Sequence, residues 1–247
     1  MKISVRLISI ISIFNIIGVG LLAGLILNIS QKEISKLAED QAYSLAAQGV
    51  EEIKNWFGVY VEKARSLANI MEGYMDIPAE ERREQFNFML KQTFIANPEV
   101  SGVYANWAPN ALDGMDTEYA NTPGTDETGR YIPTWTQGPQ GPQLGAIKGF
   151  DFNQIIQVTS GEETVFEPYF YPRGEKTVLV TNICIPIKSN SKMVGVTGIP
   201  IELSTIQAIA DTIKPLGDGY TMVFSSGGLV AGHPNSEYLG KNIKEID

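Results

Sequence analysis

The sequence predicts an α+β protein in which an apolar segment and a long helix precede an antiparallel β-sheet. Three patterns support this fold class. Residues 7–27 contain no charged side chain, and residues 31–75 carry apolar side chains mostly three or four positions apart, as on one face of a helix. The segments 177–188 and 192–203 then form two strand patterns joined by a short polar turn, which is typical of an antiparallel hairpin.

The apolar segment, residues 7–28, is predicted to be a transmembrane helix. About 20 apolar residues cover the roughly 30 Å hydrocarbon core of a bilayer. Lys2 and Arg6 precede the segment, so the positive-inside rule places residues 1–6 in the cytoplasm and the bulk of the chain outside. A cleaved signal peptide is the alternative, but no small-residue cleavage site follows the apolar run. We therefore expect a single-pass protein of the cell (inner) membrane.

Composition and charge argue against several classes of function. The formal net charge of −9 disfavours nucleic acid as a partner. The single cysteine, Cys184, excludes an internal disulfide and a cysteine-rich metal site, and the single histidine, His233, argues against histidine-based catalysis. Gly-x-Ser-x-Gly, the phosphate-binding glycine loop and His-Glu-x-x-His are absent from the sequence. We expect no enzyme activity, no cofactor and no bound metal.

The exported part begins with helices. Residues 29–78 are predicted to form one long helix, and a shorter helix is expected to begin near Pro78. Glu80 and Glu81 fall in the first turn of this shorter helix, where the helix dipole favours acidic side chains. A strand is expected at residues 100–108, before the hairpin described above.

Two further segments complete the chain. Ser204 is expected to cap a helix, which a two-strand pattern in "YTMVFSSGGLVAGHP" follows. Between Trp107 and Gly149 the sequence is rich in Gly, Pro, Asp, Asn and Thr, and it is interpreted as one long loop. Aromatic residues within it favour an ordered loop that lines a site.

The stretch "DETGRYIPTW", residues 126–135, concentrates recognition side chains. The planar guanidinium of Arg130 suits two parallel hydrogen bonds to a ligand carboxylate. The alternative is that Arg130 pairs with Asp126 or Asp116 and holds its own loop. Nearby aromatic side chains offer walls for a planar or cationic ligand. The candidate ligand-binding residues are Trp107, Asp116, Asp126, Arg130, Tyr131, Trp135, Tyr169 and Tyr171.

An acidic run from Asp113 to Glu127 overlaps this stretch. Its spacing does not match a calcium-binding EF-hand loop. We interpret the run as a solvated acidic loop, with an amine-binding acid and a metal site as lower-ranked alternatives.

The order of these parts resembles the double Cache sensory regions of bacterial methyl-accepting chemotaxis proteins. The resemblance rests on the anchor, the long helix and four motifs: "GVYANW", "FEPYFY", "VGVTGIPIEL" and "GGLVAGHPNSEYLGKNI". It implies two stacked PAS-like modules, the membrane-distal one at residues 79–208 holding the ligand and the start of the membrane-proximal one at residues 209–247. The helix nearest the membrane is the better candidate for pairing with a second copy, so a homodimer is expected.

The sequence departs from this family in two respects. Tyr171 stands where members that bind amino acids carry an amine-binding Asp, and the segment before it lacks their Arg-x-Trp-Tyr motif. The ligand therefore stays open among purine-like, amine and organic-acid compounds. A full receptor would continue past Asp247 into the rest of the second module, a second membrane helix and signalling domains, so the sequence is interpreted as a truncated piece or an incomplete receptor.

The function expected from these features is extracytoplasmic small-molecule sensing for chemotaxis. Ligand is expected to close the loop at 126–135 over the distal pocket and to shift the long helices of a dimer. The alternatives are the same sensor region on a histidine kinase or a cyclic-dinucleotide enzyme, an exported membrane-anchored hydrolase, and a structural surface protein.

Overall fold

The computed structural model describes residues 2–147, 152–173 and 176–246, apart from the side chains of 2–18, 157 and 158. The fold is α+β, as the sequence predicted. Its α-helices are α1 (Lys2–Glu72), α2 (Arg82–Ile95), α3 (Phe152–Thr159) and α4 (Ser204–Thr212). Its strands are β1 (Gly102–Trp107), β2 (Pro133–Gly138), β3 (Gly141–Ala146), β4 (Thr164–Val165), β5 (Tyr169–Arg173), β6 (Lys176–Ser189), β7 (Lys192–Glu202), β8 (Val223–Phe224) and β9 (Val230–Gly232).

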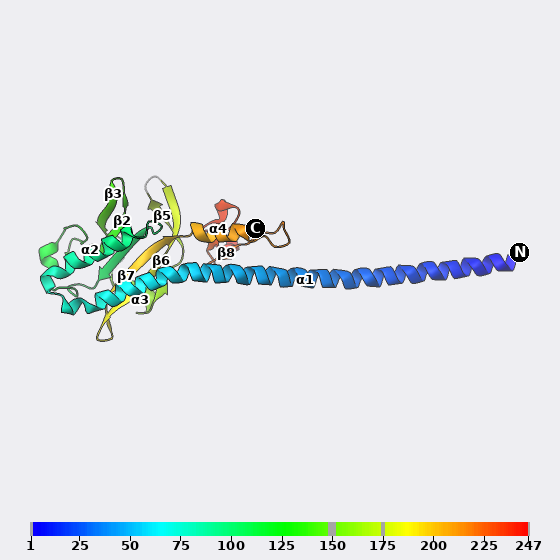
Figure 1. Cartoon of the computed structure of the whole chain (residues 1–247), viewed down its shortest axis with the longest axis horizontal. Coiled ribbons are helices and arrows are strands. Elements are labelled where there is room, and N and C mark those ends of the chain that lie inside the picture. The colour runs from blue at the N-terminus through cyan, green and yellow to red at the C-terminus, as the bar shows by residue number, and fades with distance from the viewer. Residues whose placement is uncertain (1, 148–151, 174–175, 247) are drawn as a thin grey trace.

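Helix α1 extends far beyond the rest of the molecule (Figure 1). Near its C-terminal end it packs on the sheet, where Ala64, Leu67 and Met71 are buried. No proline and only isolated glycines interrupt its sequence, so the backbone ladder continues over the whole length. The long helix expected at residues 29–78 is thus part of a single helix that also contains the apolar segment.

The predicted membrane segment, residues 7–28, lies within α1, although the side chains of residues 7–18 are outside the described part. No helix in the described part of the chain combines the length and the hydropathy needed to cross a membrane.

An antiparallel sheet forms the centre of the fold, in the order β3-β2-β1-β7-β6-β4, with β5 also paired to β6. The predicted hairpin is confirmed as β6 and β7, and its turn places Asn190 and Ser191 at positive φ. The interpretation of residues 107–149 as one long loop was wrong, because β2 and β3 form a second hairpin there. Proline and glycine at both ends of these strands hid the alternating pattern of Thr134, Trp135 and Thr136.

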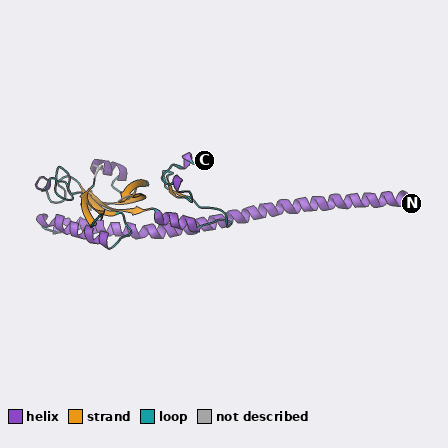
Figure 2. Ribbon diagram, turned by 90° about the horizontal axis from the view of Figure 1, so that it is seen from above, coloured by secondary structure: helices purple, strands orange, loops and turns teal. Residues whose placement is uncertain are grey.

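Helices cover both faces of this sheet, and the view from above separates the layers (Figure 2). On one face, α1 and α2 bury a core that includes Phe86, Leu90, Val103, Ile183 and Ile199. On the other face, α3 contributes Ile155 to a smaller cluster with Tyr104, Cys184 and Val196. The second face is only partly filled by this cluster, and the cavity described below lies there.

The C-terminal segment lies beside α1 on the side toward the N-terminus (Figure 1). Ile53 and Trp56 of α1 pack against a cluster that contains Leu203, Ile206 and Ala231. The two-strand pattern expected after α4 is present as β8 and β9. Ser204 is the first residue of α4 rather than its cap, because Leu203 occupies the capping position. The division into modules at 208/209 stays a prediction.

Candidate ligand-binding site

A buried arginine on α2 holds the loop that follows β1. Arg83 donates to the Asp113 carboxylate from Nε at 2.5 Å and from Nη2 at 3.0 Å, and to Asp116 from Nη2 at 2.8 Å. The side chains of Arg83, Asp113 and Asp116 are only 7%, 0% and 6% exposed. The acidic run is therefore not the solvated loop expected from the sequence, because Arg83 draws two of its carboxylates into the interior.

The same network fixes the path of the loop. Burial alone would raise the pKa of Asp113, but hydrogen bonds from Arg83 and Met115 and the positive charge of Arg83 outweigh it and lower the pKa. Arg83 also donates from Nη1 to the Gly129 carbonyl at 2.8 Å. Gly129 has φ +80°, and a Cβ there would lie 1.6 Å from the Asp116 carbonyl oxygen. Glycine is required at this crossing of two backbone segments.

Asp126 and Arg130 pair with each other inside the loop. Arg130 Nε donates to Asp126 Oδ2 at 3.2 Å, and the backbone N–H groups of Thr128 and Arg130 donate to Oδ1. Burial would raise the pKa of Asp126, but hydrogen bonds from the Thr128 hydroxyl and from the backbone N–H groups of Thr128 and Arg130, together with the Arg130 charge, lower it. Of the two roles considered for Arg130, the structure supports the one in which it holds its own loop. Closure of this loop over a pocket stays a prediction.

Three of the aromatic residues predicted to bind ligand lie instead in the core between the sheet and helices α1 and α2. Trp107 and Trp135 belong to the core beneath α1 and α2, and Trp107 stacks on Phe86 with ring centroids 6.0 Å apart. Tyr131 is 1% exposed and donates its hydroxyl to the Arg83 carbonyl at 3.2 Å. Successive strand residues point to opposite faces, so the loop aromatics expected to wall a pocket instead complete the core.

A cavity of about 700 Å³ lies on the opposite face of the sheet. Its size falls within the roughly 300–1,000 Å³ typical of small-molecule sites. Tyr169 and Tyr171 line it, as residues of β5, so it contains two of the eight residues expected from the sequence. Other walls come from β1, β2, β3, β6, β7 and α3. Its aromatic lining consists of Tyr104, Phe166, Tyr169 and Tyr171.

The floor of the cavity carries a small polar group. Asn182 Nδ2 donates to the Tyr104 hydroxyl oxygen at 2.9 Å, and that hydroxyl is also hydrogen-bonded to the Cys184 thiol. Burial raises the pKa of Tyr104 well above its usual value and that of Cys184 to about 11, with the Tyr104 hydrogen bond opposing the rise at Cys184. Burial also raises the pKa of Tyr169 and Tyr171. These four groups are therefore neutral at physiological pH.

A glycine in β7 makes room for this floor. Gly198 pairs with Tyr104 on one side and Cys184 on the other. A Cβ at Gly198 would lie 2.3 Å from the Ile183 carbonyl oxygen and 2.5 Å from the Tyr104 hydroxyl oxygen. The absence of a side chain thus lets the Tyr104 ring cross β7 and reach Asn182.

Glu167 joins the cavity wall to the C-terminal segment. It lines the cavity, and its carboxylate accepts hydrogen bonds from the Ser225 hydroxyl, from Ser226 Oγ at 3.0 Å and from Gly227 N at 2.9 Å. The Ser225 hydrogen bond, with support from the other two, lowers the pKa of Glu167. The wall between β4 and β5 is therefore tied to the turn between β8 and β9.

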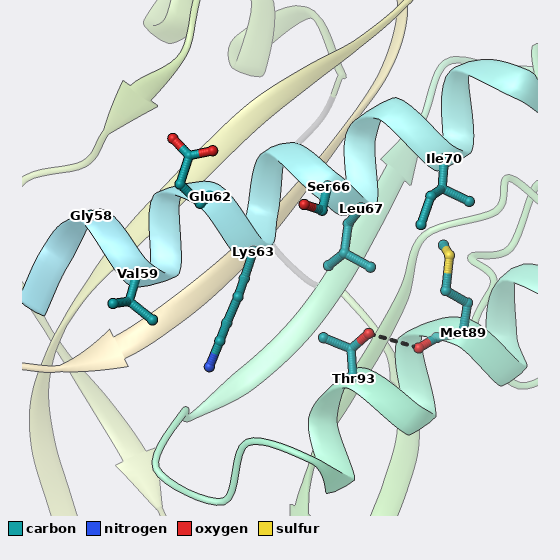
Figure 3. Close-up of a pocket in the computed structure, with 9 residues that line it drawn as sticks. All are labelled: Gly58, Val59, Glu62, Lys63, Ser66, Leu67, Ile70, Met89 and Thr93. Atoms are coloured by element: carbon teal, nitrogen blue, oxygen red, sulfur yellow. Dashed lines mark hydrogen bonds between the residues drawn. The ribbon is translucent and has the colours of Figure 1, made fainter.

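A groove of about 630 Å³ between α1 and α2 is a second hollow (Figure 3). Val59, Leu67, Ile70 and Met89 give it an apolar surface. Besides Ser66, the polar residues that line it have partners: Lys63 contacts Asn97 and Glu99, Glu62 pairs with Arg65, and Thr93 Oγ1 donates to the Met89 carbonyl at 2.9 Å. This groove offers little directed polar recognition.

No group of three or more His, Cys, Asp or Glu side chains in the described residues is arranged to hold a metal ion.

The polar floor was missed by sequence reasoning, although a signal for it existed. In "GVYANW" the residues Val103, Ala105 and Trp107 alternate with Tyr104 and Asn106. Because side chains alternate along a strand, placing Val103, Ala105 and Trp107 in the core places Tyr104 and Asn106 on the opposite face of the sheet.

Comparison with known proteins finds relatives among bacterial chemotaxis receptors. It is 33% identical over 193 residues to the methyl-accepting chemotaxis protein TlpQ of Pseudomonas aeruginosa, which covers 69% of this chain and 27% of TlpQ. It is 35% identical over 81 residues to PscA of Pseudomonas syringae, another methyl-accepting chemotaxis protein, covering 33% of this chain and 13% of PscA. The chain thus spans about a quarter or less of these relatives. No family model matches it.

Two solved structures share this fold. The extracellular domain of the candidate histidine kinase mmHK1S-Z2 matches with a TM-score of 0.73 and 27% identity, covering 83% of this chain and 76% of that one. A structure described as methyl-accepting chemotaxis protein X matches with a TM-score of 0.69 and 24% identity, covering 85% and 79%. The resemblance expected from the sequence is confirmed: the homologues are methyl-accepting chemotaxis proteins, and the structural neighbours are sensory domains of the Cache type.

Proposed function

We propose that this chain, a homologue of methyl-accepting chemotaxis proteins, is the extracytoplasmic sensing region of a transmembrane chemoreceptor. The observation that carries the proposal is the 700 Å³ cavity on the sheet face opposite α1, with aromatic walls and a buried polar floor. Of the eight candidate residues from the sequence analysis, we assign Tyr169 and Tyr171 to this site. A histidine-kinase sensor is the second candidate, supported by the likeness to the mmHK1S-Z2 domain.

The proposed membrane anchor is residues 7–28, at the N-terminal end of α1. Support comes from the uncharged sequence between Arg6 and Lys32 and from the apolar side chains that project from the helix. Val19, Leu22 and Leu27 are 66%, 60% and 63% exposed. An isolated protein would keep such a surface covered, and lipid hydrocarbon would cover it here.

We also propose a homodimer in which α1 pairs with its counterpart. Beyond the anchor, Leu37, Tyr43 and Val50 of α1 are 71%, 80% and 57% exposed, although the C-terminal segment lies beside this part of the helix (Figure 1). Helices gain most of their stability from packing, which a second α1 would supply. Sedimentation equilibrium in a density-matched detergent should give twice the chain mass of 27.1 kDa. A mass of one chain across micromolar concentrations would argue against the dimer.

A thermal-shift screen of the full chain in detergent tests the sensing function. The compounds are amino acids, amines, organic acids, nucleobases and sugars. A ligand at about 100 times its dissociation constant should stabilise the folded state by ~2.7 kcal/mol. We expect Tyr171→Ala to abolish the shift, because Tyr171 forms part of the cavity wall.

Arg130→Ala is the matched control. Since Arg130 pairs with Asp126, the variant should retain the ligand-induced shift. Silence across all five classes on a folded sample, or a shift that survives Tyr171→Ala and disappears in Arg130→Ala, would contradict the assignment.

A further inference from the structure

The turn between β8 and β9 is shaped to receive the Glu167 carboxylate. Ser226 Oγ and Gly227 N donate to Glu167 Oε1 at 3.0 and 2.9 Å, and the Ser225 hydroxyl donates to Oε2. Gly227 leaves the space that the carboxylate fills, because a Cβ there would lie 2.8 Å from the carboxyl carbon. The Ser225 hydrogen bond, followed by the other two, lowers the pKa of Glu167, so the group in the turn is ionised at neutral pH.

Glu167 lies at the rim of the cavity. Residues 166–168 join β4 to β5 and belong to neither strand; they are called the rim segment below. Glu167 lines the cavity and is also exposed, and Tyr169, next to the rim segment, lines the cavity and is 40% exposed. Side chains that meet both the cavity and the solvent separate the one from the other. The position of the rim segment therefore controls access to the cavity.

The strand that follows the rim segment has an apolar contact with the C-terminal segment. Phe170 of β5 lies against Gly240, where a Cβ would lie 2.7 Å from the ring. The C-terminal segment in turn packs on α1 through Ile53 and Trp56. Apolar packing is non-directional, whereas a hydrogen bond weakens steeply with distance and angle. An outward shift of the rim segment therefore breaks the carboxylate contact first, while the packing keeps the two parts together.

We infer that Glu167 is a latch: seated in the turn at 225–227 it holds the rim of the cavity closed, and its release opens the cavity and frees this turn. The contact lies at the exposed surface, where charged groups are held weakly, so the open and closed states are close in free energy. A compound that favours one position of the rim segment would shift this equilibrium and alter the C-terminal segment beside α1. The inference goes beyond the proposed function, because access to the cavity is measured without any ligand.

Cys184 reports the opening of the cavity. It is the single cysteine of the chain, it lines the cavity, and it is 1% exposed, so methyl methanethiosulfonate reaches it only when the structure opens. The rate of modification is measured on the full chain in detergent at one fixed pH. We expect Gly227→Ala to raise this rate about fivefold or more, the lower end of the usual coupling between linked sites. The new Cβ displaces the end of the flexible Glu167 side chain from the turn, although residue 227 does not line the cavity.

Glu167→Gln should raise the rate as well, because an amide NH₂ group cannot accept the hydrogen bond from Ser225. The double variant with Gly227→Ala should react no faster than Gly227→Ala alone, since both changes break the same contact. Glu163→Gln is the matched control: this carboxylate is also exposed, but it pairs with Arg65 on α1, and the variant should keep the wild-type rate.

Urea separates opening of the rim from unfolding. Local opening exposes little surface, so low urea concentrations should barely change the rate in Gly227→Ala, whereas global unfolding would make the rate rise steeply. A wild-type rate in Gly227→Ala, an equal acceleration in Glu163→Gln, additive effects in the double variant or a steep urea dependence would each overturn the latch. These outcomes leave the sensing function standing. A fast Gly227→Ala beside a silent compound screen would support the latch and count against sensing.

Discussion

Arg83→Ala should destabilise the protein by about 3–5 kcal/mol, because it leaves two carboxylates buried without a cation. Asp113 and Asp116 are 0% and 6% exposed, and Arg83 is their shared partner. The substitution also removes the hydrogen bond to the Gly129 carbonyl. Urea unfolding at neutral pH measures the loss of unfolding free energy, and the dependence of that free energy on urea concentration is compared between the variants.

The control is Arg65→Ala, which removes an arginine that pairs with Glu62 and Glu163 at a side-chain exposure of 41%. Exposed pairs contribute about 0–1 kcal/mol, so this variant should stay close to the wild type. Equal losses in Arg83→Ala and Arg65→Ala would refute the role of the buried network.

The difference in unfolding free energy between the wild type and Arg83→Ala should depend on pH, because the pKa of Asp113 is lowered in the folded protein. A carboxyl whose folded pKa lies below its unfolded value stabilises the fold above the unfolded pKa, about 3.9, and the contribution disappears as pH falls through the folded pKa. The gap in stability between wild type and Arg83→Ala should therefore narrow as the pH is lowered toward this range.

Gly198→Ala should destabilise the sheet by about 1–3 kcal/mol and should weaken binding in the cavity. The added Cβ meets a backbone carbonyl at 2.3 Å, and that carbonyl belongs to Ile183 in the neighbouring strand. It also meets the Tyr104 hydroxyl, so the ring must leave its place beside Asn182. Urea unfolding measures the first effect, and titration with the best compound of the screen measures the second.

Gly145→Ala in β3 provides the comparison for this variant. Its Cβ would find its nearest neighbour, Thr134 Cγ2, at 3.6 Å, which is ordinary contact. Stability and binding should both stay near the wild type, since alanine loses less freedom on folding than glycine does. If Gly198→Ala behaves as mildly as Gly145→Ala, the close approach of Tyr104 is not needed.

Much of the fold was predictable because its signals are periodic. Helix α1 and the apolar strands β6 and β7 are long, so the local hydrophobic pattern is enough to identify each as a helix or a strand. The β2–β3 hairpin was not, since its glycines and prolines resemble loop composition and its strand character depends on pairing with β1. Tertiary pairing of this kind is absent from a local window.

The site was harder to predict than the fold. Side-chain chemistry drew attention to Arg130 and Trp135, but their environment is set by neighbours distant in sequence. Arg130 forms an ion pair with Asp126 of its own loop. Trp135 lies on the face of β2 that packs against α1 and α2. The polar floor requires Tyr104 and Asn182 to meet across β7, 78 positions apart in the chain.

A crystal structure of the chain with the first compound that stabilises it tests the central claim most directly. We expect the compound between Tyr104, Tyr169 and Tyr171, on the sheet face opposite α1. Density in the groove between α1 and α2, or at the loop around Arg130, would contradict the assignment of the cavity as the sensing site.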